Sequence, residues 1–180
     1  QIPDSDERDV EIAVHAAGRA FREWSSMPAE KKFSILNKIA DLIDENSAAL
    51  ALAETEDNGK PLWLSKRMDI PRASDNFRFF ATAIMHYAST SHNMGNRAIN
   101  YTLRQPIGIV ACISPWNLPL YLFTWKIAPA LAAGNCVIAK PSEVTPITSF
   151  LLGKICSEAG LPNGVLNILH GRGNSTGESI

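Results

Sequence analysis

The sequence lacks a long apolar run free of charge, and Lys126 interrupts its most apolar region. A membrane-spanning helix needs about 20 consecutive apolar residues, so we expect no transmembrane segment. Strong charge of either sign is also missing. With 17 basic and 18 acidic residues the net charge is −1, which argues against nucleic-acid and anionic-membrane partners. The first residues have neither a signal peptide nor an initiator methionine, so we expect the chain to be cut from a longer protein.

Cysteine is scarce, and the spacing of Cys112, Cys136 and Cys156 fits neither a disulfide framework nor a metal site. An odd set of this kind favours a reducing compartment, and we expect a cytoplasmic protein. No neighbouring histidine or cation is expected to lower the pKa of these thiols, as a reactive cysteine requires. We therefore interpret all three as buried structural residues. No metal is expected, because the four histidines lack ligand spacing and should be hydrogen-bonded or solvent-facing: His15, His86, His92 and His170.

Hydrophobic residues make up 46% of the chain and charged residues 19%, a balance typical of a globular protein. Apolar residues first repeat at helical spacing behind Ser5 and Asp6, either of which can cap a helix. Met27-Pro28 should end that helix, and Pro28 suits the first turn of the next. Further helices are predicted over 29–46, 47–57 and 62–88, the last kinked or split at Pro71.

The pattern changes after this helical front. Residues 91–96 read as a polar turn, and 97–104 alternate apolar and polar side chains as a half-buried strand does. Strands and helices then alternate, which predicts parallel pairing. The expected strands are 107–113, 135–139 and 164–169, and the helices between them are 118–133 and 146–159. The fold class is therefore α/β. We divide the chain into a helical front (1–90), a strand segment (91–105) and an incomplete Rossmann-like parallel sheet (106–180).

Polar groups follow each of the three strands, at the sheet edge where α/β proteins bind ligands. The first strand leads into Ile113-Ser114-Pro115-Trp116-Asn117-Leu118-Pro119, the second into Lys140-Pro141-Ser142-Glu143, and the third into the loop 171–177. Asn117 has two interpretations. Its amide is suited to stabilising a developing oxyanion, but asparagine is also a favoured helix N-cap.

Lys140 and Glu143 also have two interpretations. A carboxylate at this place accepts hydrogen bonds from a ribose, whereas the plain alternative is a surface ion pair. The loop reads Gly-x-Gly-x-x-x-Gly, one residue longer than the usual dinucleotide fingerprint. It fits a phosphate-binding turn at the start of a helix or an ordinary glycine-rich turn.

These three motifs, in this order and spacing, resemble the NAD(P)-dependent aldehyde dehydrogenase superfamily, as do Asp9 to Val14 and Asp57-Asn58-Gly59-Lys60-Pro61. The resemblance implies that Asn117 holds the oxyanion and that the cofactor is bound by Ile113, Ser114, Pro115, Trp116, Lys140, Ser142, Glu143, Gly173 and Gly177. It also implies NAD as the cofactor, because the Glu143 carboxylate would repel the 2′-phosphate of NADP. The family's nucleophilic cysteine, which forms a thiohemiacetal, and its general-base glutamate both lie downstream of Ile180, and the catalytic domain is absent.

The segments Asp69-Ile70-Pro71-Arg72 and Ser114 to Leu122 look most like the 2-aminomuconic and 2-hydroxymuconic semialdehyde dehydrogenases. Such substrates carry a carboxylate remote from the aldehyde, which an arginine fork suits. Arg72 is the candidate, with a solvent-facing helix arginine as the alternative. The resemblance implies oxidation of an aldehyde to an acid by a homodimer or homotetramer in which 91–105 supplies oligomerisation strands. The alternative function is a non-catalytic truncated module that retains dinucleotide or subunit binding.

Overall fold

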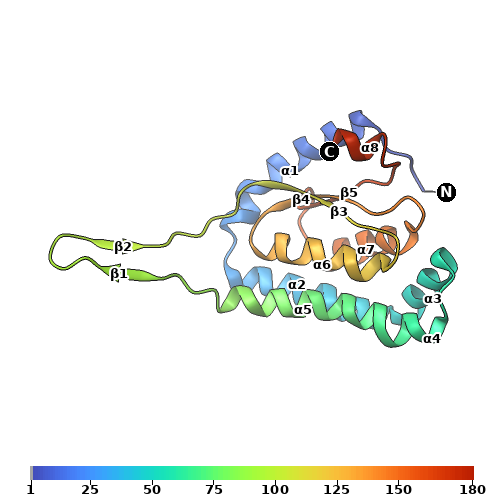
Figure 1. The fold of residues 1–180 in the computed structure, drawn as a ribbon, viewed down its shortest axis with the longest axis horizontal. Coiled ribbons are helices and arrows are strands. Elements are labelled where there is room, and N and C mark those ends of the chain that lie inside the picture. Colours follow the sequence, from blue (N-terminus) through green and yellow to red (C-terminus); the bar gives the residue numbers. More distant parts are fainter. Residues whose placement is uncertain (1) are drawn as a thin grey trace.

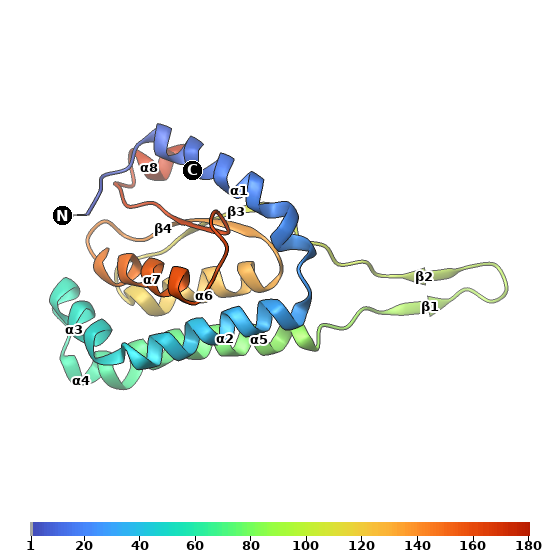
Figure 2. The same ribbon diagram turned by 180° about the vertical axis from the view of Figure 1, so that it is seen from behind.

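The computed structural model describes residues 2–180 as layers of helices around a small parallel sheet (Figure 1). Helices α1 (Glu7–Ser26) and α8 (Thr176–Ser179) lie on one face of the sheet, and α6 (Pro119–Ala132) and α7 (Ile147–Glu158) lie on the other. A further layer, α2 (Ala29–Glu45) and α5 (Ile70–Met85), packs beneath α6 and α7 (Figure 2). The expected α/β class is confirmed. Among the described residues, no helix combines the length and the apolar character needed to cross a membrane.

The sheet has the strand order β3-β4-β5, with β3 at Ile109–Ile113, β4 at Cys136–Lys140 and β5 at Leu166–Ile168. Both pairings are parallel, as the alternation of strands and helices predicts. Every residue of β4 is buried, because helices cover both faces of this central strand. Because the strands are parallel, their carboxyl ends all lie at the same edge of the sheet.

The ends of the first helices follow from local chemistry. The Asp6 carboxylate accepts hydrogen bonds from the N–H groups of Arg8 and Asp9, and the Asp9 carboxylate accepts one from Asp6 N–H. This reciprocal pair is a capping box. Pro28 occupies the N-cap of α2 rather than its first turn. Helix α3 (Ser47–Asn58) ends at Gly59, whose φ of 75° favours glycine.

The predicted helix 62–88 is a single helical path with one irregular turn. It comprises α4 (Leu62–Leu64), a π-helical turn η1 (Ser65–Asp69) and α5. The expected irregularity at Pro71 thus lies immediately before that residue. Proline has no N–H to donate to the carbonyl four residues earlier, and the wider π turn accommodates this loss.

The segment 91–105 contains an antiparallel hairpin that projects from the body (Figure 1). Its strands are β1 (Ser91–Asn93) and β2 (Ile99–Tyr101). Two expectations were wrong here: Ser91–Asn93 is a strand rather than part of a turn, and β2 is exposed rather than half-buried. The strands pair only with each other, so no described residue covers the apolar side chains of Ile99 and Tyr101.

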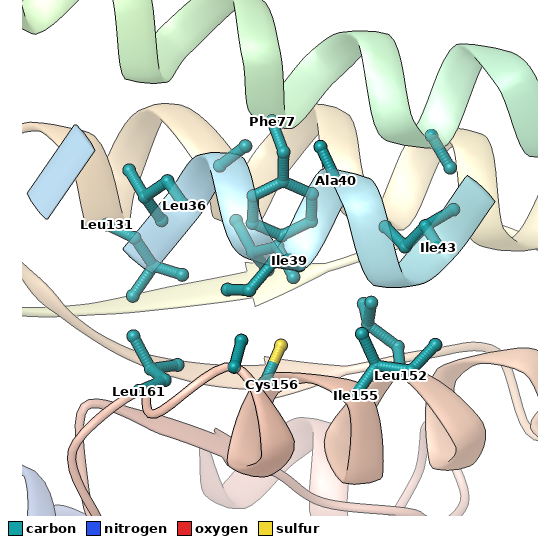
Figure 3. Packing of buried hydrophobic residues seen from close by; sticks show 14 of the residues in the cluster. Leu36, Ile39, Ala40, Ile43, Phe77, Leu131, Leu152, Ile155, Cys156 and Leu161 are labelled. Carbon is teal, nitrogen blue, oxygen red and sulfur yellow. The ribbon is translucent and has the colours of Figure 1, made fainter. Parts of the chain in front are cut away.

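The main core lies between α2, α5, α6 and α7 (Figure 3). Phe77 of α5 points toward Ile39 and Ala40 of α2, and all three side chains are fully buried. On α1, Trp24 is also fully buried, and its indole N–H donates to the carbonyl of Leu131. These contacts fix α6, which leads away from the polar sheet edge.

Candidate functional site

The polar segments after β3, β4 and β5 meet at one edge of the sheet. Ile113 pairs with Lys140 at the ends of β3 and β4, and Ser114 N–H donates to the Lys140 carbonyl at 3.1 Å. On the other side, Leu169 N–H donates to the Ala139 carbonyl at 2.9 Å. The parallel register therefore brings together the three motifs that the sequence places far apart.

Lys140, Glu143 and the glycine loop form one hydrogen-bonded cluster. The Lys140 side chain is almost fully buried, and its Nζ lies 3.0 Å from Glu143 Oε2 and donates to the Pro141 carbonyl at 3.1 Å. Glu143 Oε1 accepts from Gly173 N–H at 3.1 Å. The backbone N–H of Glu143, the Lys140 ammonium and the Gly173 amide lower the pKa of the Glu143 carboxyl to about 2. A permanently ionised carboxylate thus lies beside a buried cation at this edge.

Glycines of the loop lie beside this cluster. A Cβ atom added at Gly177 would lie 3.7 Å from the Lys140 side chain, and one at Gly173 would lie 3.7 Å from Glu143 Oε1. At Gly171 a Cβ would overlap Thr176 Oγ1, which itself donates to the Ser5 carbonyl. Glycine at these positions leaves the space beside Lys140 and Glu143 free of side chains.

A cavity of about 210 Å³ adjoins the cluster, and Glu143, Pro146 and Arg172 are among the residues that line it. A larger cavity of about 470 Å³ lies beyond it between α7 and β5, and it is lined mainly by nonpolar groups. His170 borders both. Of the two cavities, the smaller one is the candidate site, because Glu143 of the cluster lines it and does not line the larger one.

The residues after β3 line the neighbouring part of the edge. Ile113, Pro115 and Trp116 are exposed, with 61% of the Trp116 surface open to solvent. Ser114 is buried, and its Oγ has no hydrogen-bond partner among residues 2–180. Ser142, after β4, is half-buried, and its Oγ accepts from Val144 N–H at 3.4 Å. The edge thus offers one unpaired buried hydroxyl beside an open apolar wall.

Asn117 is not the helix N-cap. Leu118 occupies that position at the start of α6, and no side chain caps the helix there. Asn117 itself is exposed, and its amide makes no hydrogen bond to any described residue. The capping interpretation therefore lacks the bond that defines a cap, and the amide is available to a ligand.

Arg72 lies on the exposed side of α5 and contacts α6 through Tyr121. Its Nη1 donates to Tyr121 Oη at 3.4 Å, and its Cζ lies 5.4 Å from the Tyr121 ring centroid. Asn76, one turn farther along α5, donates to the Tyr121 carbonyl at 3.1 Å. Sequence reasoning identified Arg72 but missed Tyr121, which has no motif of its own beyond its place four residues after Asn117.

The three cysteines are free and buried. Burial raises the pKa of all three thiols, that of Cys136 to about 11 and that of Cys156 to about 12. The structural interpretation is confirmed, with one correction. Lys126 does act on Cys112 and lowers its pKa, but the larger effect of burial outweighs this cation.

Three histidines are exposed as expected, but His170 is not. It is buried, and its Nδ1 has no hydrogen-bond partner within the described part of the chain. Burial, and to a lesser degree Lys140, lowers its pKa, which favours the neutral imidazole. Within residues 2–180, no cluster of three or more histidine, cysteine or acidic side chains is arranged to hold a metal ion.

Comparisons with known proteins agree with this geometry. The model of the aldehyde dehydrogenase family matches residues 1–180. The 2-aminomuconic semialdehyde dehydrogenase of Bos taurus is 49% identical over 99% of this chain and 37% of its own length. The 2-hydroxymuconic semialdehyde dehydrogenase of Pseudomonas sp. CF600 is 43% identical over 96% of the chain and 37% of its length.

A solved structure of indole-3-acetaldehyde dehydrogenase in complex with NAD⁺ matches 99% of this chain and 36% of its own, with a TM-score of 0.96 and 36% identity. The chain thus spans little more than a third of the proteins that it matches. Because the family model covers every residue, this chain belongs to the aldehyde dehydrogenase family.

Proposed function

We propose that the chain is the N-terminal part of an NAD-dependent enzyme that oxidises a muconic-type semialdehyde to a carboxylic acid. The observation that carries this proposal is the cluster of Lys140, Glu143 and Gly173 at the strand edge. An ionised carboxylate, a buried cation and a glycine backbone without side chains are groups that bind the ribose and phosphates of a dinucleotide. A solved relative of this fold is described in complex with NAD⁺.

The residues present fit this cofactor. Glu143 is placed to accept hydrogen bonds from the ribose hydroxyls, and Lys140 to donate to them. Gly173 and Gly177 leave room for the ribose and its phosphate beside these groups. The unpaired Ser114 hydroxyl and the wall of Ile113, Pro115 and Trp116 continue the surface toward Asn117. Ser142 supports the turn that presents Glu143. When bound, NAD accepts the hydride of the aldehyde.

Asn117 acts on the aldehyde oxygen. Its free amide donates a hydrogen bond to the negative charge that develops on this oxygen when a nucleophile attacks the carbonyl carbon. The resemblance places the nucleophilic cysteine and the general-base glutamate beyond Ile180. The raised pKa values of Cys112, Cys136 and Cys156 agree with that assignment. This chain therefore supplies the cofactor edge and the oxyanion donor, and the remainder supplies the covalent chemistry.

Arg72 recognises the substrate's remote carboxylate. Its guanidinium is exposed and, among the described residues, has no acidic partner. Arg78 on the same helix differs, because it pairs with Asp41 at 2.6 Å and Asp44 at 2.7 Å. An exposed guanidinium that lies over an aromatic ring and has no acidic partner suits a carboxylated ligand. The relatives named for muconic semialdehydes support this substrate class.

The exposed hairpin supplies strands for assembly into a homodimer or homotetramer. Its two strands leave backbone edges and the side chains of Ile99 and Tyr101 uncovered, and such edges favour pairing with another chain. The three free thiols fit a cytoplasmic enzyme, and the substrate is the small-molecule aldehyde rather than a macromolecule.

The test of this proposal is NADH formation by the purified full-length protein with 6-oxohexanoate, a stable six-carbon semialdehyde. We expect aldehyde-dependent NADH, with NAD used in preference to NADP. The competing function is a non-catalytic truncated module. An intact native mass near 19.6 kDa supports the module. A mass of about 50 kDa supports the enzyme, because this chain corresponds to 37% of such a relative.

A further inference from the structure

Arg72 is not isolated on α5, because its guanidinium contacts Tyr121 of the neighbouring helix α6. The guanidinium carbon lies 5.4 Å from the ring centroid and Nη1 lies 3.4 Å from the phenol oxygen. Arginine stacks on an aromatic face without losing the in-plane N–H groups of its fork. The stack therefore fixes the guanidinium and leaves donors for another acceptor.

Tyr121 is itself held in place. Its carbonyl accepts from Asn76 Nδ2 at 3.1 Å and from Thr124 Oγ1 at 3.0 Å. Asn76 Nδ2 also lies 2.9 Å from Thr124 Oγ1, and both of these side chains are buried. The Tyr121 ring meets the Trp125 ring edge to face, with centroids 5.7 Å apart. These contacts lock α5 and α6 together where Arg72 and Tyr121 meet.

The phenol of Tyr121 can also act as a hydrogen-bond donor. Because Arg72 donates to the Tyr121 oxygen, the phenol hydrogen remains free. A carboxylate beside the pair can accept from the guanidinium and from this hydroxyl together. Hydrogen bonds to charged groups are stronger than neutral ones, and donors already in place do not have to be ordered on binding.

We propose that Tyr121 is a specificity-determining residue that aligns Arg72 and donates its own hydrogen bond to the substrate's remote carboxylate. This inference rests on the proposed function of Arg72. Tyr121 lies in the first turn of α6, four residues after Asn117. The same short segment therefore connects recognition of the carboxylate with stabilisation of the oxyanion.

The experiment uses the full-length protein with NAD and two matched substrates, 6-oxohexanoate and hexanal, which differ only in the carboxylate. Tyr121→Phe removes the hydroxyl and keeps the ring. We expect kcat/KM for 6-oxohexanoate to fall about tenfold, mainly through KM, since a hydrogen bond to a charged group is of this size. For hexanal, kcat/KM should stay within about twofold.

Tyr87→Phe is the matched control. Tyr87 makes the same kind of pair with Arg104, at 3.4 Å and 5.0 Å, but at the root of the hairpin. It should leave the substrate ratio unchanged. In an Arg72→Met background, Tyr121→Phe should have a smaller effect than in wild type, because the part of its role that aligns Arg72 is already lost.

Three outcomes would overturn the inference, and the measurements distinguish them. If Arg72→Met lowers the ratio of 6-oxohexanoate to hexanal efficiency but Tyr121→Phe leaves it unchanged, the role of Tyr121 is overturned and that of Arg72 stands. If Arg72→Met leaves the ratio unchanged, the carboxylate site is overturned and the role of Tyr121 with it. An equal loss for both substrates would make Tyr121 a structural residue and would also overturn the inference.

Discussion

At the scale of single residues, the backbone position of Asn117 excludes one of the two roles considered for its side chain, that of the helix cap. The helix begins one residue later, at the Leu118 cap, so the Asn117 amide is not used by the α6 backbone. In the full-length protein, we expect Asn117→Ala to lower turnover about 100-fold or more and to leave NAD affinity nearly unchanged. Steady-state kinetics and NAD titration measure the two quantities. Turnover within about threefold of wild type would mean that the amide does not contact the oxyanion.

We propose that Glu143 sets the cofactor preference by charge. Its pKa near 2 keeps it ionised throughout the physiological pH range, so a 2′-phosphate always meets a like charge. Two charges about 4 Å apart repel by roughly 4 kcal/mol at a protein surface, and Lys140 reduces this value. In the full-length protein, Glu143→Gln should weaken NAD binding modestly and raise the relative efficiency with NADP. The exposed Glu56→Gln is the control, and an unmoved ratio of efficiencies in Glu143→Gln would exclude this role.

Single residues were predictable where a motif carried them. Asn117, Lys140, Glu143 and the loop glycines lie at strand ends that apolar runs make visible in the sequence. Tyr121 was not predictable, because its partner Arg72 lies 49 positions away and only the packing of α5 on α6 joins them. His170 was mispredicted for the same reason, since its burial depends on tertiary packing rather than on neighbours in the chain.

At the scale of elements, the π turn η1 lies over a buried cluster of charges. Lys60 Nζ lies 2.5 Å from Asp69 and 3.8 Å from Glu54, and both carboxylates are fully buried. One ammonium therefore lies beside two buried acids. Burial raises the pKa of Glu54 to about 7 against the pull of Lys60. Glu54 is therefore protonated at mildly acidic pH.

This cluster predicts a pH effect on stability. The folded protein binds the Glu54 proton more tightly than the unfolded chain, so stability falls as pH rises from about 4.5 to about 7. Glu54→Gln cannot ionise. Relative to wild type it should gain up to about 3 kcal/mol between pH 5 and pH 8, because a tenfold change in an ionisation constant is worth about 1.4 kcal/mol. Thermal unfolding of both full-length proteins across this range tests the point. Parallel pH curves would show that Glu54 does not titrate there.

The hairpin allows a second test at this scale. Thr102 N–H donates to the Thr90 carbonyl at 2.9 Å. The two arms of the hairpin are therefore already paired at the point where it could be shortened. Replacing residues 91–101 by Asn-Gly in the full-length protein removes both strands and supplies a tight turn. We expect smaller assemblies by light scattering. A Met94→Ser variant, which changes only the turn, is the control. An unchanged molar mass after the deletion would show that the hairpin is not required for oligomerisation.

Periodicity predicted the type of most elements, with the strand Ser91–Asn93 as an exception, but it did not predict their burial. The alternation along 97–104 correctly indicates extended structure, but it cannot say whether a partner covers the apolar side. The kink near Pro71 was placed within a few residues, because proline's missing N–H is a local property. Its form as a π turn over Ser65–Asp69 was not visible in the sequence, because the missing N–H of Pro71 does not by itself specify how the backbone accommodates the loss.

At the scale of the whole molecule, the order of the helical layers could not be predicted from the sequence. Helix α1 packs on the sheet while α2 and α5 lie on the far side of α6 and α7, although all three helices belong to the same helical front (Figure 1). Local amphipathicity says that each helix is partly buried but does not name its partner. The parallel sheet was predictable, because strands separated by helices return in the same direction. The shared strand edge followed from that topology.

The 180-residue chain alone should bring cofactor and oxyanion groups together without a nucleophile. Aldehyde oxidation in this family needs a thiolate, and the three cysteines here are buried. With a pKa of about 11 for Cys136 and about 12 for Cys156, only on the order of one thiol in 10,000 or fewer is ionised at pH 7. We expect no aldehyde-dependent NADH above background from the purified 180-residue polypeptide, with the full-length protein as the positive control. NADH formation that disappears in a Cys112→Ser variant would instead assign the nucleophile to the cysteine nearest the site, because Cys112 precedes the end of β3 by one residue.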